Sequence, residues 1–582
     1  MRHNFISRGG PTLFLAATFA LSSASSLAAL ADDGDDSGSP PPAVARVSVA
    51  DGDVGVKHGQ SDQVAAAINA PVEAGDYLTT GNDGRTEIQL DPSNVVRAAG
   101  NTQIRFTTLN GASDTVQLAQ GTVELRVLQA DNDHPTVQTP SADVVPDEAG
   151  AYFVSVDQNG MTSVTVRSGS LDVNTPQGSQ TLNPGRTMQI TGSADNPQYQ
   201  YVDEVAASDF DNWADSRDQM LADSNAYQNV NGDMLGASDL DQYGQWQNIS
   251  GYGEAWQPNN AAPDWSPYSD GNWSYQPYYG WTWVSAEPWG WAPYHYGRWA
   301  FVGSSWYWVP GPRYIAPVYS PALVAFFGFG GGGVGLGLGF GFGHIGWVPL
   351  APGEAFHPWW GAGRAVVYNN TRIINNYRNA GHGLVGLPVT GWQHGDFGHI
   401  TRLSPTVVGG ARAIGGRLPF TPTAANYRYS SRSIGATVSK PMYTRFNSIH
   451  PIGDARPSYA VRSSYARGMY TSSNTWQRFG GEQRTERYAS ERSGFTGSGD
   501  GWQHFNAAGG SYQRSSYGQP YQRSSYGQPH QRSSYGQPYQ RSSYSRSSYQ
   551  PQQRSYQAPQ RSYSRSETQS RGSGNPHGRP HM

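Results

Sequence analysis

The chain has 582 residues, of which 71 are glycine and 39 are proline, and only 14% are charged. So many helix-breaking residues exclude long helices over most of the length and favour short strands, turns and loops. The formal net charge is -4, and there is no cysteine, which excludes a disulfide framework, a thiol nucleophile, a cysteine-ligated metal and a lipoprotein anchor.

The N-terminus predicts a cleaved secretory signal. A short basic start precedes an apolar, small-residue run from 11 to 30, and Ala-Leu-Ala at 29–31 gives an A-x-A cleavage site. A membrane anchor fits less well because several serines dilute the apolar run. We therefore expect residues 1–31 to be a signal peptide and residues 32–42 an acidic, proline-rich linker. The mature chain is expected to be extracytoplasmic, either periplasmic or secreted and associated with the cell surface.

Residues 43–200 have the pattern of a β domain. Short runs in which apolar and polar residues alternate recur at close spacing, as at 44–49 and 122–127. Turn residues such as Asp51-Gly52 and Asn159-Gly160 separate these runs. Many short strands with regular turns predict an all-β sandwich, roll or β-helix-like stack.

The same residues resemble FecR-like domains. The stretch 74–90, AGDYLTTGNDGRTEIQL, is similar to the G-D-x-L-x-T-G-x-x-G-x-x-x-L core of that family, and later pieces agree in order at 118–123, 137–140, 166–171 and 182–186. The resemblance implies an extracytoplasmic β module that senses or binds something. The best-known members are periplasmic parts of iron-siderophore signalling regulators, where the domain follows a cytoplasmic anti-sigma segment and one membrane helix. Here a signal peptide replaces both, so the resemblance does not extend to direct transmembrane signalling.

Residues 201–235 change period and predict a helical connector. The segment is acidic and polar, and it is punctuated by a few apolar side chains: Val205, Phe210, Trp213, Met220 and Leu221. We expect one helix or two, capped by Asp203 or Ser208, that pack an aromatic stripe on a neighbouring element.

Tryptophans gather in the stretch from 273 to 310, and most of them form pairs two residues apart. These pairs are Trp281/Trp283, Trp289/Trp291, Trp299/Phe301 and Trp306/Trp308. Residues two apart on a strand point to the same face, so the spacing predicts short, turn-linked strands with one aromatic face. That face either fills a small β core, which the large area buried by each ring favours, or stacks on a sugar or another protein.

If the aromatic face is open, its rings and the polar side chains at its rim are the candidate ligand-binding residues. They are Trp281, Trp283, Trp289, Trp291, Tyr294, His295, Tyr296, Arg298, Trp299, Trp306 and Trp308. Arg298 can instead stack on Trp299 or on an adjacent tyrosine. No cofactor, metal ligand or catalytic residue is indicated, because the chain has no nucleophile elbow, P-loop or H-E-x-x-H and its histidines lack ligand spacing.

The aromatic region as a whole, residues 236–376, resembles the DUF6600 family of bacterial envelope proteins. The resemblance rests on pieces at 210–213, 240–246, 288–299, 308–311, 321–326 and 346–354. A FecR-like domain often precedes this block in that family, whose function is not established. The resemblance therefore implies a two-domain extracytoplasmic architecture and no particular activity.

A glycine-rich run without formal charge follows at 323–342. Its length would allow a membrane helix, but nearly half of its residues are glycine, which weakens both hydrophobicity and helix propensity. Residues 335–342 alternate with period two, which predicts a buried strand rather than a transmembrane segment.

The rest of the chain predicts little ordered structure. Residues 377–500 have few periodic apolar runs, so we expect them to be mostly irregular or disordered. Residues 501–582 repeat Gln-Arg-Ser-Ser-Tyr-Gly-Gln-Pro with a period of nine and form a low-complexity tail. Its evenly spaced arginine and tyrosine side chains suit weak, multivalent contacts with anionic polymers, and export makes intracellular nucleic acid an unexpected partner.

The fold class expected from these observations is all-β in two modules, with a short helical connector and a disordered low-complexity C-terminal tail. The function expected first is that of a non-enzymatic extracytoplasmic binding or scaffold protein that contacts cell-envelope components, either polysaccharide or protein. The alternative is a FecR-related periplasmic sensor or regulatory protein. An enzyme acting on envelope polymers is the third hypothesis, and no motif supports it.

Overall fold

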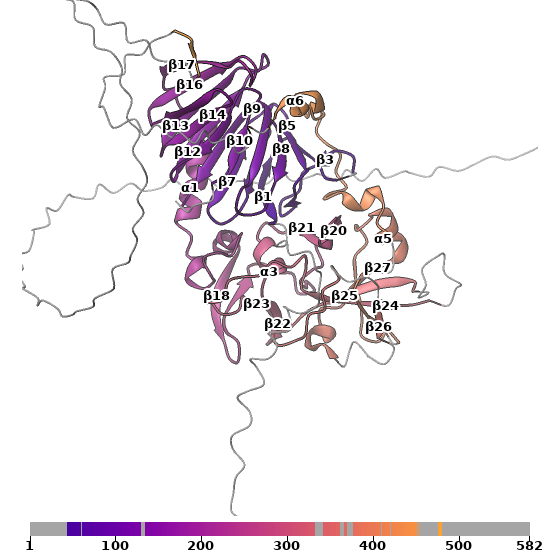
Figure 1. Cartoon of the computed structure of the whole chain (residues 1–582). Helices are drawn as coiled ribbons and strands as arrows, with labels where there is room; N and C mark the ends of the chain where they lie inside the picture. The colour runs from indigo at the N-terminus through magenta and orange to yellow at the C-terminus, as the bar shows by residue number, and fades with distance from the viewer. Residues whose placement is uncertain are drawn as a thin grey trace, which may run out of the picture. The chain divides into compact units, whose positions relative to one another are not determined.

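The computed structural model describes most of the chain between residues 43 and 479. The described ranges are 43–59, 61–129, 134–331, 342–360, 366–368, 376–408, 410–418, 421–450, 452 and 475–479. All of them belong to the first of the two compact units into which the chain divides, residues 1–487. The predictions for the signal peptide, the acidic linker and the repeat tail concern residues outside these ranges. Within the described ranges strands far outnumber helices, which confirms the all-β prediction (Figure 1).

The first β domain is built from two sheets. One sheet has the order β4–β1–β6–β7–β9–β12–β13–β16–β17, and its neighbouring strands are all antiparallel. Its strands are β4 (Pro71–Val72), β1 (Ala45–Asp51), β6 (Arg85–Gln89), β7 (Asn94–Ala98), β9 (Thr115–Val127), β12 (Gly150–Val156), β13 (Thr162–Ser168), β16 (Arg186–Thr191) and β17 (Gln198–Asp203).

The other sheet has the order β3–β2–β5–β8–β9–β10–β11–β14–β15, in which β9 and β10 are parallel. Its further strands are β3 (Val64–Ala65), β2 (Val54–Lys57), β5 (Tyr77–Thr80), β8 (Gln103–Thr108), β10 (Thr136–Gln138), β11 (Asp143–Pro146), β14 (Leu171–Thr175) and β15 (Gly178–Leu182). Apolar side chains of both sheets share one buried cluster, which is the core of the domain.

Strand β9 passes from one sheet to the other at Gly121. Its first half pairs with β8, whereas the half that starts at Gly121 pairs with β12. Gly121 has a φ of 95°, and a Cβ atom added to it would lie 2.4 Å from the Cα of Thr102. Only glycine accepts both the left-handed conformation and this close approach, so the bend that joins the two sheets depends on it.

The predicted connector, residues 201–235, contains one full helix, α1 (Asp209–Ala222), followed by η2 (Ala226–Gln228). The helices η3 (Ala237–Asp239) and α2 (Leu240–Tyr243) come next and belong to the region predicted as aromatic. The predicted cap at Ser208 is confirmed. Its hydroxyl accepts from the first-turn amides, and Asp211 closes a capping box by accepting from the Ser208 backbone. The predicted aromatic packing is confirmed for Phe210, whose ring lies edge-to-face on Phe153 at 6.0 Å, but Val205 and Met220 are exposed.

The aromatic domain begins with a four-stranded antiparallel sheet and a separate hairpin. The sheet has the order β18–β19–β23–β22, with β18 (Gly244–Ile249), β19 (Gly253–Pro258), β23 (Ser305–Val309) and β22 (Arg298–Val302). The hairpin pairs β20 (Gly271–Gln276) with β21 (Gly280–Ser285). These strands carry three of the four predicted ring pairs.

The prediction of a strand for the fourth pair, Trp289/Trp291, is wrong. Trp291 opens the short helix α3 (Trp291–His295), and Gly290 before it has a helical φ of -75°. Pro293 lies in the first turn of this helix, where its missing N–H costs no helical hydrogen bond and its fixed φ suits the turn. A period-two pattern of rings is therefore not sufficient evidence for a strand here.

A six-stranded antiparallel sheet completes the aromatic domain, in the order β26–β29–β24–β25–β27–β28. Its strands are β26 (Val366–Tyr368), β29 (Arg412–Gly415), β24 (Val324–Phe329), β25 (His344–Pro349), β27 (Val385–Pro388) and β28 (Thr401–Arg402), and α5 (Val389–His394) follows β27. Strand β24 confirms buried sheet at the start of the glycine-rich run, while residues 332–341 lie outside the described ranges. No helix in the described part of the chain has both the length and the apolar character to cross a membrane.

The expectation that residues 377–500 are mostly irregular is wrong for their first part. Strands β27, β28 and β29 belong to the sheet just described, and the short helix η4 (Arg378–Gly381) precedes β27. Each of these strands has at most four residues. Segments this short contain too few residues to show either the two-residue period of a strand or the 3.6-residue period of a helix. The aromatic domain therefore extends past the expected boundary at 376 to about Leu418.

Residues 421–450, the return segment, run back to the first β domain. They include η5 (Ala424–Tyr427) and α6 (Tyr443–Ser448). Ser430 donates to the carbonyl of Ala65 at 2.9 Å, and the backbone N–H of Met442 donates to Gln103 at 2.8 Å. Phe446 is 1% exposed and lies edge-to-face on Tyr77, with ring centroids 5.2 Å apart. Further on, β30 (Gln477–Arg478) pairs with the edge strand β17. These segments pack on the first β domain instead of remaining irregular.

Candidate functional site

The residues predicted to bind a ligand form the core of the aromatic domain. Every one of them except Arg298 is buried: Trp281, Trp283, Trp289, Trp291, Tyr294, His295, Tyr296, Trp299, Trp306 and Trp308. The most exposed of these, Tyr296, shows 7% of its surface. Strand β21 is buried at all its positions, so it has no open aromatic face. The hypothesis that these rings stack on a sugar is therefore corrected in favour of the core, which the large area of each ring had already favoured.

Hydrogen bonds fix several of these rings in the core. The indole N–H of Trp299 donates to the carbonyl of Pro293 at 2.9 Å, and that of Trp308 donates to the carbonyl of Tyr296 at 2.9 Å. The hydroxyl of Tyr294 donates to Glu287 at 3.0 Å. Burial raises the pKa of Glu287 to about 7, against the lowering effect of its hydrogen bonds with Ser285, Trp265 and Tyr294. Sequence reasoning missed this buried carboxyl, which accepts hydrogen bonds from the predicted ring Tyr294 and from Trp265.

Two polar members of the predicted set have structural surroundings. His295 Nδ1 lies 2.8 Å from the carbonyl of Ser320, so it carries the proton and donates. Burial lowers the pKa of His295 to about 4, which keeps the ring neutral at ordinary pH. Arg298 donates to the carbonyl of Gly297 at 2.9 Å, and its guanidinium lies 5.9 Å from the centre of the Phe356 ring rather than on Trp299.

The aromatic domain and the first β domain share a buried ionic contact that sequence reasoning missed. The side chain of Arg46 in β1 is 0% exposed, and its Nη2 lies 2.7 Å from a carboxylate oxygen of Asp239 in η3. Arg46 also donates to Gln89 at 2.7 Å. Nearby, Asn69 donates to the carbonyl of Glu287 at 2.7 Å. No local sequence pattern predicts such contacts, because the partners are distant in sequence.

Helix α1 is held to the first β domain mainly by charges. Arg97 on β7 is fully buried and lies 2.8 Å from each of three carboxylates, on Glu87, Glu124 and Asp218. Arg217 of the helix reaches Glu87 at 2.8 Å. Burial alone would raise the pKa of Glu87, but the hydrogen bonds and charges of the two arginines lower it to about 2. Glu87 is therefore ionised, and it pairs the sheet with the helix that leads to the aromatic domain.

A third contact brings titratable side chains together beside the β20–β21 hairpin. His58 Nδ1 lies 2.7 Å from Asp76, both side chains are almost fully buried, and the ring centre of Tyr429 in the return segment is 4.8 Å from that of His58. Several buried polar atoms here have no hydrogen-bond partner among the described residues: His58 Nε2, Glu73 Oε1, both amide atoms of Gln276, and the hydroxyls of Tyr319 and Tyr429. We call this set the buried polar cluster.

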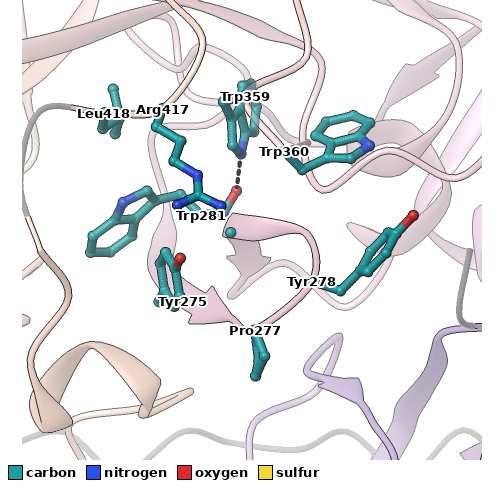
Figure 2. A pocket seen from close by; sticks show the side chains of 9 residues that line it. Tyr275, Pro277, Tyr278, Trp281, Trp359, Trp360, Arg417 and Leu418 are labelled. Atoms are coloured by element: carbon teal, nitrogen blue, oxygen red, sulfur yellow. Dashed lines mark hydrogen bonds between the residues drawn. The ribbon is translucent and has the colours of Figure 1, made fainter. Parts of the chain in front are cut away.

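A shallow hollow, the aromatic hollow, lies on the aromatic domain. It encloses about 300 Å³ with the space open to solvent included, and three segments line it: Tyr275, Pro277, Tyr278, Gly280 and Trp281 around the β20–β21 turn, Trp359 and Trp360, and Arg417 with Leu418. Figure 2 shows Arg417 extending among Tyr275, Trp281 and Trp359, with Tyr278 and Trp360 to one side. Only Trp281 of the predicted ligand-binding residues belongs to this lining. In the described ranges, no three His, Asp or Glu side chains are placed to hold a metal ion.

Two family models match the chain in the order that the sequence predicts. The model described as FecR protein matches residues 76–172, and the family of unknown function DUF6600 matches residues 237–354. The FecR match lies within the first β domain, and the DUF6600 match covers η3, α2 and most of the aromatic domain.

Parts of two solved structures are also similar to this chain. Both are crystal structures of a proposed anti-sigma factor from Parabacteroides distasonis ATCC 8503, with 21% and 20% identity and a TM-score of 0.20. Each comparison covers 22% of this chain and 60% of the other, so this chain spans less than two thirds of that protein. No protein of curated description matches the chain.

Proposed function

We propose that this chain is a FecR-related, non-enzymatic regulatory protein of the extracytoplasmic space, in which the aromatic domain and the FecR-matching domain act as one unit. The family match to FecR supports the regulatory class. The observation that carries the proposal is the buried ion pair between Arg46 and Asp239, which joins the two domains.

Regulation requires that an event at one site changes the free energy of another, and this requires a physical link between them. The Arg46–Asp239 pair is such a link because the Arg46 side chain is fully buried and the Asp239 side chain is only 18% exposed, so the arginine cannot lose its partner without a large cost. Breaking one member of a buried pair costs about 3–5 kcal/mol. A movement of η3 relative to β1 therefore has a large energetic consequence, which couples the two domains more strongly than a passive spacer would.

Transcript profiling in the native cells tests the regulatory role. Cells that lack the chain are compared with cells that carry the wild type or Asp239→Asn. We expect a defined set of transcripts to change in the absence of the chain, to be restored by the wild type, and to remain changed with the variant even though the variant is present at normal levels. An unchanged transcript profile in cells that lack the chain would contradict a regulatory function.

The matched control is Asp51→Asn. Asp51 pairs with Arg85 at 2.8 Å, but both side chains are largely exposed, at 57% and 42%. Exposed pairs contribute little to stability, so this control should restore the transcripts as the wild type does. Export is part of the proposal, and fractionation of the same cells should find the mature chain outside the cytoplasm.

A second function is favoured by a different observation. The aromatic hollow presents ring faces and one cation to solvent, which suits a non-enzymatic binding or scaffold protein that contacts an envelope polysaccharide. The repeat tail would add weak contacts with anionic polymers. Sedimentation of the purified mature chain with cell-wall polysaccharide tests this function, and a chain that stays in the supernatant would contradict it.

A further inference from the structure

The floor of the aromatic hollow is held rigidly. The indole N–H of Trp359 donates to the carbonyl of Trp281 at 2.9 Å, as the dashed line in Figure 2 shows. Trp281, Trp359 and Leu418 are 2%, 3% and 6% exposed, so they close the bottom of the hollow against the core. Gly280 has a φ of 70°, and a Cβ atom there would lie 3.4 Å from Trp359, so the turn and the floor lie within van der Waals reach of each other.

The rim, in contrast, is open. Tyr278 is 48% exposed, and Pro277 and Arg417 are also exposed. Trp360 is partly exposed, and its ring lies edge-to-face on Tyr279, with centroids 6.0 Å apart, which supports it from behind. A ring that is supported on one side and partly open on the other can receive a flat ligand without a loss of side-chain freedom on binding.

The charged lining of the hollow is only positive. Its lining contains an arginine and no aspartate or glutamate. Among the residues that the structure describes, Arg417 has no hydrogen-bond or ion-pair partner. A guanidinium offers a planar fork of N–H donors that matches the two oxygens of a carboxylate. The hollow therefore favours a ligand with an anionic group beside an apolar face.

From these features we propose that the aromatic hollow binds one acidic sugar residue, a hexuronate, within an envelope polysaccharide. The C–H face of the pyranose ring lies on Trp360 and Tyr278, and its carboxylate pairs with Arg417. This inference rests on the second proposed function and names its ligand. A shallow, open site lets the polymer continue on both sides.

Calorimetric titration of the purified full-length mature chain with a short oligogalacturonate tests the proposal, with a maltooligosaccharide of similar length as the neutral comparison. We expect saturable binding of the acidic sugar only. Trp360→Ala and Arg417→Gln should each weaken it about tenfold or more, the loss expected for one stacked ring or one charge-assisted contact. Raising the salt concentration should weaken binding to the wild type and have little effect on what remains with Arg417→Gln.

Matched controls separate the hollow from the general surface. Arg412→Gln removes an exposed arginine of β29, and Tyr314→Ala removes a tyrosine that is 86% exposed, and neither side chain lines the hollow. Both controls should bind oligogalacturonate as the wild type does. Because Arg417 is itself exposed, Arg417→Gln should also unfold at the wild-type temperature, which excludes misfolding as the cause of weaker binding.

Each other outcome overturns part of the proposal. Equal binding of both sugars, unaffected by Arg417→Gln, would disprove the acidic class and leave a neutral polysaccharide binder. Saturable binding of a polyproline peptide to the same residues, with no sugar bound, would make the occupant a peptide. If neither sugar binds but the chain still sediments with cell-wall polysaccharide, the hollow is the wrong site and the binding function remains. If the chain also fails to sediment with cell-wall polysaccharide, both the hexuronate site and the polysaccharide-binding function are contradicted.

Discussion

Arg46 of β1 and Asp239 of η3 form an ion pair of 2.7 Å in which the arginine side chain is 0% exposed. The pair joins two segments separated by nearly two hundred residues, one in the first β domain and one at the start of the DUF6600 match. The guanidinium also lies 6.0 Å from the centre of the Trp291 ring. One side chain of the first β domain thus contacts both η3 and a ring of the aromatic core.

Loss of this arginine should destabilise the whole unit. Arg46→Ala leaves the Asp239 carboxylate without its partner, and we expect the free energy of unfolding to fall by about 3–5 kcal/mol. Denaturant titration measures the change. The exposed partner Arg85→Ala serves as the control and should cost under about 1 kcal/mol. Equal effects of the two substitutions would contradict the importance assigned to the buried pair.

The buried polar cluster should make stability depend on pH. Burial raises the pKa of Glu73 to about 7 from 4.5, with His58 lowering it and Asp76 raising it further. A carboxyl with a raised pKa in the folded state holds its proton more tightly there than in the unfolded chain. Its raised pKa therefore costs no stability below about pH 4.5, where both states are protonated, and stability falls as pH rises through the window to about 7.

His58 changes the stability in the same direction, so that stability falls as pH rises. Its pKa is raised despite burial, through the charge and hydrogen bond of Asp76 and the charge of Glu73. The stability that it contributes is full below its unfolded value of 6.5 and is lost as pH rises through its higher folded value. The tyrosines 279, 319 and 429 also face Glu73 but stay neutral across this window, because burial raises their pKa values further.

Glu73→Gln tests this dependence. The amide cannot ionise, so the variant should be more stable than the wild type at pH 8, by about 1–3 kcal/mol, and the difference should disappear at pH 4. Thermal unfolding followed at several pH values gives the comparison. A difference that stays constant from pH 4 to pH 8 would show that Glu73 does not titrate in the folded protein.

Removal of a buried aromatic ring of the core should strongly destabilise the protein. Trp308 is 0% exposed, and its removal in Trp308→Ala should cost about 3–5 kcal/mol, the usual effect of deleting a large buried ring. Tyr314→Ala, on an exposed loop, should stay within about 0.5 kcal/mol of the wild type. If Trp308→Ala were equally harmless, the ring would not be packed as the structure places it.

The bend in β9 allows a comparison of two glycines. Gly121 and Gly160 both have positive φ, at 95° and 86°, but a Cβ atom at Gly160 would meet nothing within 4 Å. Gly160→Ala should therefore cost only the conformational strain, about 1–2 kcal/mol. Gly121→Ala should cost clearly more because its methyl group would also overlap the backbone of Thr102. Unfolding midpoints measure both, and similar losses would contradict a close approach at Gly121.

Local signals in the sequence predicted the local parts of this fold. The Ser208 cap was predictable because a capping box lies within four residues, and the alternating runs of the first β domain follow from a sheet with one buried face. The ring pairs at 281/283 and 306/308 lie on strands as predicted. The burial of both faces of β21 was not predictable, because period two does not tell whether a second layer covers the outer face.

The contacts between distant segments could not be predicted from the sequence. From its place in an alternating run, Arg46 is expected to expose its guanidinium to solvent. Only the fold brings Asp239 next to it. The rim of the aromatic hollow combines Tyr278, Trp360 and Arg417, which share no motif and no spacing. Strands β27 and β29 are too short to show a period, and their partners supply the pairing that makes them strands.

Hydrogen–deuterium exchange under increasing denaturant tests the central claim, that the two domains form one coupled unit. Amides of β9 report the first β domain, and amides of β22 and β23 report the aromatic domain. We predict that both sets lose protection at the same denaturant concentration in the wild type, and at separate concentrations in Arg46→Ala. Loss of protection at two well-separated concentrations in the wild type would contradict the coupling.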